Sequence, residues 1–280
     1  MNQSMFIVWR ESVEALLVIG ILQAWISQQP EDSRLGRFLW AGVVLGLLCS
    51  GGLAGLMLWA GEAMSGPGGE WFQAGMTLLA SLLMVQMVFW MHRHGPGLRH
   101  TLLREADQRA ARQGGLGLLL LALLAVSREG SETVVFLYGA GAHLDGPALA
   151  LFAIGGGLGL VLAGLTVMLL RSTRRLISWS SFFALSEALL LLLAASLLVA
   201  AVERIGGQLL AMDMPNWVYT LVGEAWWDSS VLLSDSHGLG AVLAGFAGYR
   251  ATPSTITLLV LAGYWLLVGR GLYRARRAPL

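Results

Sequence analysis

The sequence predicts an all-α polytopic membrane protein with seven transmembrane helices, and three observations lead to this fold class. The 280 residues are 56% hydrophobic and only 12% charged, and the mean hydropathy is +0.68. Soluble domains carry about 25% charged residues, so one globular core could not bury this much apolar surface. The apolar runs are also long enough to cross a bilayer as helices, and they do not alternate as strands would.

Seven apolar runs reach the length of about 20 residues that a transmembrane helix needs. They cover residues 5–27, 37–60, 71–91, 115–141, 147–170, 182–203 and 254–272. Residues 239–249 would add an eighth crossing, but this run is short and glycine-rich, and we interpret it as re-entrant or interfacial. The first run contains one arginine and two glutamates, which argues against a cleaved signal peptide. We therefore expect a single transmembrane domain over 1–280.

The arginines orient these spans, because the chain contains no lysine. Most of them fall in the loops after spans one, three and five and in the C-terminal tail: Arg34, Arg37, Arg93, Arg99, Arg104, Arg109, Arg112, Arg171, Arg174, Arg175, Arg270, Arg274, Arg276 and Arg277. The opposite side has only Arg204 and Arg250. The positive-inside rule then places the N-terminus outside and the C-terminus inside, which requires an odd number of spans.

The acidic residues outside the spans favour the external side. They are Glu62, Glu70, Asp145, Glu203, Asp213, Glu224, Asp228 and Asp235. Such a surface would raise the local concentration of cations, although a solvated face with no further role is the alternative. The only cysteine, Cys49, lies in an apolar run, which excludes a disulfide framework and a thiolate metal cluster.

An internal repeat relates the first three spans to the next three. "RESVE" in span one matches "REGSE" in span four, spans two and five are both glycine-rich, and "ASLLMV" in span three matches "ASLLVA" in span six. The order is shared and the offset is nearly constant. We expect repeat one over about 5–91 and repeat two over about 115–203, followed by an external segment at 204–253 and a last helix at 254–272. Three spans are an odd number, so the two repeats would be inverted, as in many transporters.

The two charged motifs could meet inside the membrane. Glu11 would lie ~9 Å and Glu132 ~14 Å from the outer ends of their helices, at about 1.5 Å per residue. Close approach of helices is predicted by small-xxx-small spacing, at Gly42/Gly46, Gly51/Gly55 and Gly155/Gly159. A charge at the bilayer centre costs about 2.5–3.5 kcal/mol, so two such motifs need either mutual pairing or a function.

The charges of the two motifs indicate a cation site. Four carboxylates (Glu11, Glu14, Glu129 and Glu132) and two guanidiniums (Arg10 and Arg128) sum to a net negative charge. Carboxylate oxygens suit hard di- or trivalent cations, and the arginines could hold the empty carboxylates in place and keep them ionised. The alternative is that the arginine–glutamate pairs only lock helices together.

These motifs resemble the paired Arg-Glu-x-x-Glu signatures of the high-affinity iron permease family. "WWDSSVLLSD" and "LAGFAGYRATPS" before the last span are also similar to bacterial members. The resemblance implies an iron importer of the bacterial inner membrane with seven spans and an external N-terminus. It implies that iron binds Glu11, Glu14, Glu129 and Glu132, and that separate extracytoplasmic proteins deliver or oxidise the iron. The usual Arg-Glu-Gly-Leu-Glu differs here at Ser12 and Val13, which affects packing more than chemistry.

Several other residues are weaker candidates. Glu187, near the cytoplasmic end of span six, could be a release site or a proton acceptor, or simply an interfacial glutamate. Asp228, Asp235 and His237 could collect metal at the outer mouth. The methionines at 57, 64, 84, 87 and 91 are interpreted as apolar filling rather than as a soft-metal path.

Two other kinds of function remain as alternatives to iron import: transport of another divalent metal such as lead or manganese, and a non-transporting membrane scaffold. The chain has no Walker motif, no His-Glu-x-x-His and no histidine in a predicted span, so we do not expect an enzyme. We expect no permanent cofactor. Membrane lipid and the iron ion are the expected partners, and no nucleic acid is expected.

Overall fold

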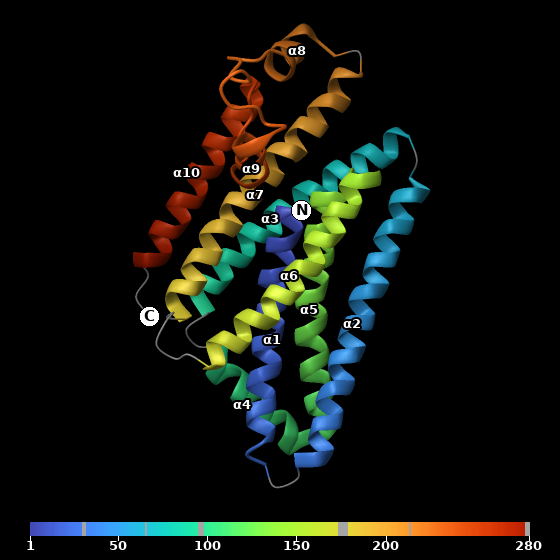
Figure 1. The fold of residues 1–280 in the computed structure, drawn as a ribbon, viewed down its shortest axis with the longest axis vertical. Coiled ribbons are helices and arrows are strands. Elements are labelled where there is room, and N and C mark those ends of the chain that lie inside the picture. The colour runs from blue at the N-terminus through green and yellow to red at the C-terminus, as the bar shows by residue number, and fades with distance from the viewer. Residues whose placement is uncertain (30–31, 65, 95–97, 173–178, 213, 278–280) are drawn as a thin grey trace.

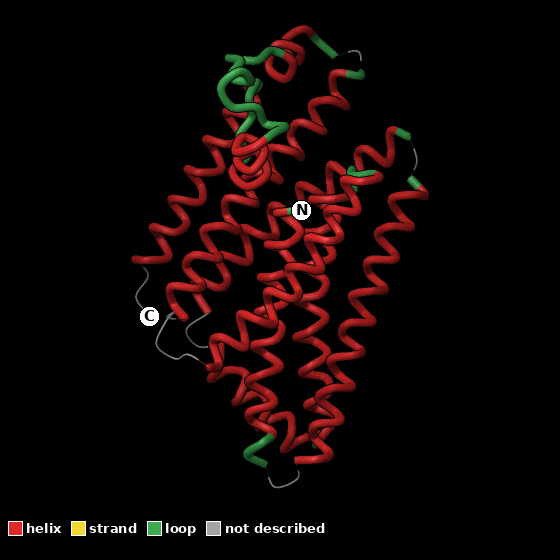
Figure 2. The backbone as a smooth tube through the Cα atoms, in the orientation of Figure 1, coloured by secondary structure: helices red, strands yellow, loops and turns green. Residues whose placement is uncertain are grey.

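The structure is a computed structural model that describes residues 1–29, 32–64, 66–94, 98–172, 179–212 and 214–277. The described residues are almost entirely helical (Figure 2). The helices are α1 (Asn2–Ile26), α2 (Asp32–Ala63), α3 (Pro67–His94), α4 (Leu98–Gln113), α5 (Gly115–Gly141), α6 (Gly146–Ser172), α7 (Trp179–Leu210), α8 (Asn216–Gly223), α9 (Gly238–Ala247) and α10 (Thr255–Arg277).

Five of these helices are long and apolar enough to cross a membrane. The candidate spans are Arg34–Ala63, Pro67–His92, Gly146–Leu169, Ala184–Leu210 and Thr255–Arg274. Helices α1 and α5 are also long enough, with 25 and 27 residues. They are not among the five candidates because every 18-residue stretch of either helix includes one of the charged motifs, and each motif contains three charged residues. The two helices that fall outside the simple composition test are therefore those that carry the motifs.

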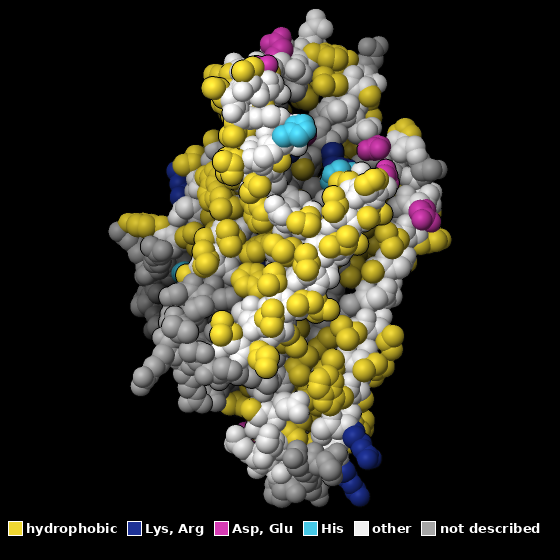
Figure 3. Space-filling model, in the orientation of Figure 1, with side chains coloured by type: hydrophobic (Ala, Val, Ile, Leu, Met, Phe, Trp, Pro, Cys, Tyr) yellow, Lys and Arg dark blue, Asp and Glu magenta, His cyan; other side chains and the backbone are white. Residues whose placement is uncertain are grey.

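The long helices pack in a regular pattern. Helix α1 lies beside α6, α2 lies beside α5, and α3 lies beside α7, while α1 and α5 also contact each other (Figure 1). These pairings are unchanged when α1, α2 and α3 are exchanged with α5, α6 and α7. Hydrophobic side chains cover the middle of the face drawn in Figure 3, as expected for a surface in contact with lipid.

Glycines allow the two helices of a pair to pack closely against each other in two of these pairs. A Cβ atom at Gly42 of α2 would collide with the Leu119 carbonyl of α5, and one at Gly46 would lie 2.9 Å from the Val126 Cβ. In the same way, a Cβ at Gly155 of α6 would collide with backbone and side-chain atoms at the start of α1. The predicted small-xxx-small packing is thus confirmed at these positions.

The prediction was wrong for the remaining glycine pair. Gly51 and Gly55 are also on α2, but a Cβ atom added at either residue meets nothing within 4 Å. Gly51 is exposed, so this part of α2 turns away from its neighbours. The spacing alone could not distinguish the α5-facing glycines from these, because all four lie on one uniformly apolar helix.

The segment between spans three and four contains a helix that we expected only as a loop. Helix α4 places Leu102 and Ala106 in a core cluster with residues of α1 and α5. The Trp25 indole N–H also donates a 2.7 Å hydrogen bond to Asp107 Oδ1. An amphipathic helix with few apolar residues can be held in this way by its packing against two long helices.

The segment between α7 and α10 folds back onto the helix bundle. Helix α9 packs on α7, where Ser196 Oγ donates to the Ala244 carbonyl at 2.9 Å, and it also contacts the start of α1 through Gln3. An isolated β-bridge joins Ala225 to Ser254. The run 239–249, interpreted as re-entrant or interfacial, therefore forms a short helix of 10 residues that ends before Gly248.

Candidate metal site

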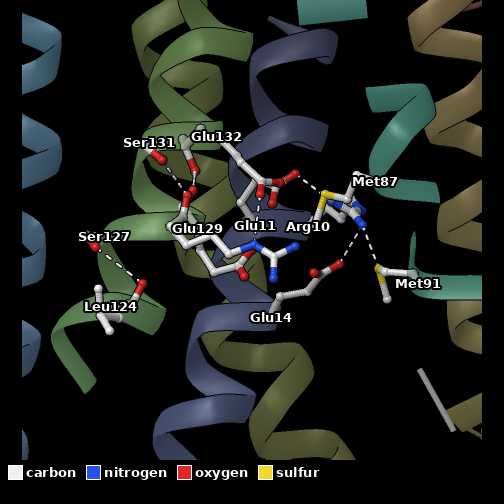
Figure 4. A network of polar contacts seen from close by, with 12 residues as sticks. Arg10, Glu11, Glu14, Met87, Met91, Leu124, Ser127, Glu129, Ser131 and Glu132 are labelled. Carbon is white, nitrogen blue, oxygen red and sulfur yellow. Dashed lines mark hydrogen bonds and ion pairs between the residues drawn. The ribbon is translucent and has the colours of Figure 1, made fainter. Parts of the chain in front are cut away.

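The two charged motifs face each other across the contact between α1 and α5 (Figure 4). Each of Glu11, Glu14 and Glu129 offers a carboxylate oxygen, and these oxygens all lie within 4.8 Å of one another. The i, i+3 spacing of Glu11 and Glu14 puts both on one face of α1, and the packing of α1 on α5 adds Glu129. Glu132 comes from the same face of α5, but it is not part of this group of three.

The carboxylates are buried and incompletely paired. Glu11 is 1% exposed and Glu129 is 9% exposed. Among the described residues, the Oε2 atoms of Glu11, Glu129 and Glu132 have no hydrogen-bond partner. An unpaired buried carboxylate oxygen carries a large desolvation cost. Three such oxygens, contributed by two helices, are therefore candidate ligands for a cation.

Arg10 is the cation that the structure itself places beside this group. It is 1% exposed, and its Nη1 and Nη2 atoms lie 2.6 Å from Glu11 Oε1 and 2.7 Å from Glu14 Oε1. The same two nitrogens donate to Met87 Sδ at 2.9 Å and to Met91 Sδ at 3.0 Å. A fixed planar guanidinium can satisfy two carboxylates at once, and here two thioethers complete its surroundings.

The role of Met87 and Met91 was missed by sequence reasoning, which interpreted them as apolar filling. Their i, i+4 spacing on α3 was the available signal, because it predicts that both side chains lie on one face. Nothing in the sequence indicated that this face points at Arg10. The contact depends on how α3 packs against the rest of the bundle.

Arg128 is held differently from Arg10. Its Nε lies 3.1 Å from Glu132 Oε1, and its guanidinium carbon lies 4.2 Å from the centre of the Trp90 ring, an electrostatically favourable cation–π contact. The Arg128 side chain is 43% exposed. It lines a pocket of about 440 Å³ between α2 and α5, together with Cys49, Ser50, Leu124, Ser127 and Ser131.

The differences between the two motifs have packing reasons. A Cβ at Gly130, in the second motif, would collide with the Ser50 side chain of α2, so this position accepts only glycine without rearrangement. The corresponding Ser12 of the first motif is partly exposed, and there the close contact is made by Val13, which is fully buried against Ala163 and Val167 of α6. All charged positions of the motif are retained.

The other candidate residues are not part of this group of carboxylates. Glu187 Oε2 on α7 is 3.6 Å from His92 Nδ1 on α3. Asp228 is exposed, and hydrogen bonds from the Ser230 hydroxyl and from the Ser230 N–H, the latter at 2.8 Å, lower the Asp228 pKa. Asp235 and His237 contact Ala251 and Ser236 respectively. These outer residues, all of them described, do not gather as three ligands around one point.

Comparison with known proteins identifies the family. The Iron permease FTR1 family matches residues 1–270 of the chain. This chain belongs to that family. The resemblance inferred from the two Arg-Glu-x-x-Glu motifs is thus confirmed, and the family is described as one of iron permeases.

Individual FTR1-family relatives are similar over nearly their full length. "Ferrous iron permease EfeU" of Escherichia coli O6:H1 is 26% identical over 263 residues, which cover 91% of this chain and 88% of the relative. The protein of the same name from Yersinia pestis is 26% identical over 257 residues, covering 89% and 84%. An uncharacterized protein of Archaeoglobus fulgidus is 27% identical over 268 residues, covering 94% and 91%. No solved structure matches the chain.

Proposed function

We propose that this protein imports iron into the cytoplasm through an intramembrane site formed by Glu11, Glu14, Glu129 and Glu132. The observation that carries the proposal is the convergence of three carboxylates from two helices within 4.8 Å, in a chain of the FTR1 family. The glutamates supply oxygen ligands. When the site holds no metal, the two arginines lower the electrostatic cost of keeping the carboxylates charged and buried.

Ferrous iron is the substrate that we propose. Relatives over most of the chain carry the name "Ferrous iron permease". The charge balance fits a divalent ion, because four carboxylates and two guanidiniums leave a net charge of about −2 in the site. A divalent cation would neutralise this charge, whereas a trivalent one would leave an excess positive charge inside the membrane.

The proposed topology has seven spans, with an external N-terminus and a cytoplasmic C-terminus. Helices α1 and α5 would cross in addition to the five apolar candidates, because α6 and α2 cover their sides and the charged motifs face inward. The exchange symmetry of the helix pairs and the glycine contacts that α2 and α6 make in each half support an inverted repeat. We place the protein in the bacterial inner membrane, with separate extracytoplasmic proteins delivering the iron.

Arg10 would act as the occupant that the metal displaces. It now holds one oxygen of Glu11 and one of Glu14 at 2.6 and 2.7 Å. As iron binds these carboxylates, the guanidinium would keep its contacts with Met87 and Met91 on α3. The thioethers are weak acceptors, so they can hold the displaced cation without binding it as tightly as a carboxylate would.

The experiment is uptake of radiolabelled Fe²⁺ by the purified protein in liposomes, with each of the four glutamates replaced by glutamine. Glu11→Gln, Glu14→Gln and Glu129→Gln should each lower uptake at least about tenfold, the loss typical of a damaged metal site. The matched control is Glu105→Gln on α4, because Glu105 is half exposed and only weakly paired with Arg109 at 4.0 Å.

The same assay separates the alternatives. If uptake of Mn²⁺ or Pb²⁺ exceeds that of Fe²⁺ and depends on the same glutamates, the substrate assignment is wrong. If the wild-type protein carries none of these metals, a scaffold role replaces the transport proposal. Full uptake by all four glutamine variants would show that the carboxylates serve only to hold α1 and α5 together.

A further inference from the structure

We propose that His92 of α3 and Glu187 of α7 form a second metal site, on the cytoplasmic side of the four glutamates, which receives the ion before its release. This inference rests on the proposed import function and adds an exit site to it. The two side chains come from different helices and meet at one end of the α3–α7 pair.

The spacing of the two side chains fits two ligands of one ion. His92 Nδ1 and Glu187 Oε2 are 3.6 Å apart, which is too long for a hydrogen bond. Two ligands at about 2.0–2.2 Å from a tetrahedrally coordinated metal lie roughly 3.3–3.6 Å from each other. Imidazole together with carboxylate is a suitable donor set for Fe²⁺, which accepts both nitrogen and oxygen.

The pair lies next to the Glu14 end of the main site. Arg10 of α1 donates to Met91 of α3, so this contact places Met91 at the level of the first motif. His92 is the next residue of α3, and Glu14 lies one turn, about 6 Å, beyond Arg10 along α1. Glu187 is near enough to Glu14 for their like charges to repel each other. A metal leaving Glu14 would therefore meet Glu187 and His92 next.

Exposure increases along this sequence of groups. The side chain of Glu11 is 1% exposed, that of Glu14 13%, that of Glu187 17% and that of His92 31%. The ends of α3 and α7 that carry the pair lie beside the end of α10, which is cytoplasmic in the proposed topology (Figure 1). The groups thus lead from the buried Glu11 to a partly exposed pair on the side where the metal would be released.

The chemistry of the second site favours release. Two protein ligands leave half of the positions of a tetrahedral ion to water, whereas the main site offers up to four carboxylates. The ion would therefore bind more weakly at His92 and Glu187 than at the main site. A weaker second site can receive the ion once it has left Glu14 and still lets it dissociate into the cytoplasm.

An ion pair that fastens α3 to α7 is the competing explanation of the contact. The structure already joins these helices elsewhere, through the Ser81 hydroxyl, which donates to the Ala194 carbonyl at 2.8 Å, and through Arg204, which donates to Gln73 at 3.0 Å. A partly exposed His–Glu pair contributes little to stability. The variant His92→Lys separates the two explanations, because lysine keeps a cation opposite Glu187 but is no metal ligand at neutral pH.

The first test counts Co²⁺ ions bound to the purified protein by equilibrium dialysis, with the visible absorption of Co²⁺ as a second readout. We expect the wild-type protein to bind one Co²⁺ ion tightly and a second one more weakly; these are called the tighter and the weaker equivalent. His92→Ala, His92→Lys and Glu187→Gln should lose the weaker equivalent, and the double variant Glu11→Gln/Glu129→Gln should lose the tighter one. His100→Ala on α4 is the control, because His100 is exposed and outside both sites.

The outcomes distinguish this proposal from the proposed function. If the weaker equivalent persists in His92→Ala and Glu187→Gln, the second site is wrong. If the tighter equivalent is absent from the wild-type protein but the weaker one depends on His92, the four-glutamate site fails while the second site stands. In Fe²⁺ uptake, His92→Lys should be slowed roughly tenfold, as for a damaged metal site. Uptake at the wild-type rate in His92→Lys would show that an ion pair suffices and would overturn the proposal.

Discussion

Arg10 and Arg128 occupy the same position in the two motifs, yet the Arg10 side chain is 1% exposed and the Arg128 side chain is 43% exposed. Arg10 contacts two carboxylates and two thioethers, whereas Arg128 contacts one carboxylate and the face of Trp90. The repeated sequence thus provides one buried and one accessible guanidinium at a single site.

Arg10→Ala should destabilise the protein far more than Arg128→Ala. Removal of one partner from a buried ion pair costs about 3–5 kcal/mol, because Glu11 and Glu14 would be left unpaired. A partly exposed pair contributes only about 0–1 kcal/mol. Thermal unfolding of both variants in the same detergent measures the difference. Equal shifts of the unfolding temperature would contradict the difference in burial.

Met87→Leu and Met91→Leu should weaken the hold on Arg10 without changing the packing volume. Leucine fills similar space but accepts no hydrogen bond from the guanidinium, and such swaps usually cost less than about 1.5 kcal/mol. We expect near-normal stability but slower Fe²⁺ uptake in the double variant. Met84→Leu is the matched control, since Met84 is fully buried in the core cluster that contains α7 residues. If the double variant takes up Fe²⁺ as fast as Met84→Leu, the two thioethers play no part in transport.

Alanine at the packed glycines should be much more harmful than alanine at the open ones. Gly42→Ala and Gly159→Ala would place a methyl group against backbone atoms of the neighbouring helix, and overpacking typically costs about 1–3 kcal/mol. Gly51→Ala and Gly55→Ala meet nothing within 4 Å and should be neutral or slightly stabilising. Unfolding temperatures of the four variants provide the comparison. Similar losses in all four would contradict the α2–α5 and α1–α6 contacts.

Acidification should destabilise the protein through His143. This residue follows α5, and burial, together with repulsion from Arg204, lowers its pKa from the ordinary value of 6.5, although Asp145 opposes the shift. The unfolded chain then binds the proton more readily, so stability is lost as the pH falls through about 6.5. The unfolding temperature should drop between about pH 7.5 and about pH 5.5 in the wild-type protein and less in His143→Gln. An identical drop in both proteins would exclude His143 as a source of this pH dependence.

The sequence predicted the parts of the site that depend on one helix at a time. The i, i+3 and i, i+4 spacings within "RESVE" and "REGSE" fix which faces of α1 and α5 carry the charges, and the repeated motif indicated that the two faces meet. The contacts of Met87, Met91 and Trp90 could not be predicted. They depend on the rotation and depth of α3, which no spacing in its uniformly apolar sequence determines.

Charge composition was also an incomplete guide to structure. The polar segment after span three was expected as a loop, yet it contains α4, because Leu102 and Ala106 pack on the bundle. Gly51 and Gly55 share the spacing of Gly42 and Gly46 but face open space. In both cases the deciding factor is which side of an element meets a neighbour, and that information comes only from the assembled fold.

The most direct measurement of the central claim is the position of a bound metal in an experimental structure of the protein prepared with Fe²⁺ under anaerobic conditions. An anomalous difference map collected at the iron absorption edge would locate the ion. We predict a peak at about 2.0–2.3 Å from carboxylate oxygens of Glu11, Glu14 and Glu129. An iron peak only at other residues, with these glutamates still paired to Arg10, would contradict the four-glutamate site.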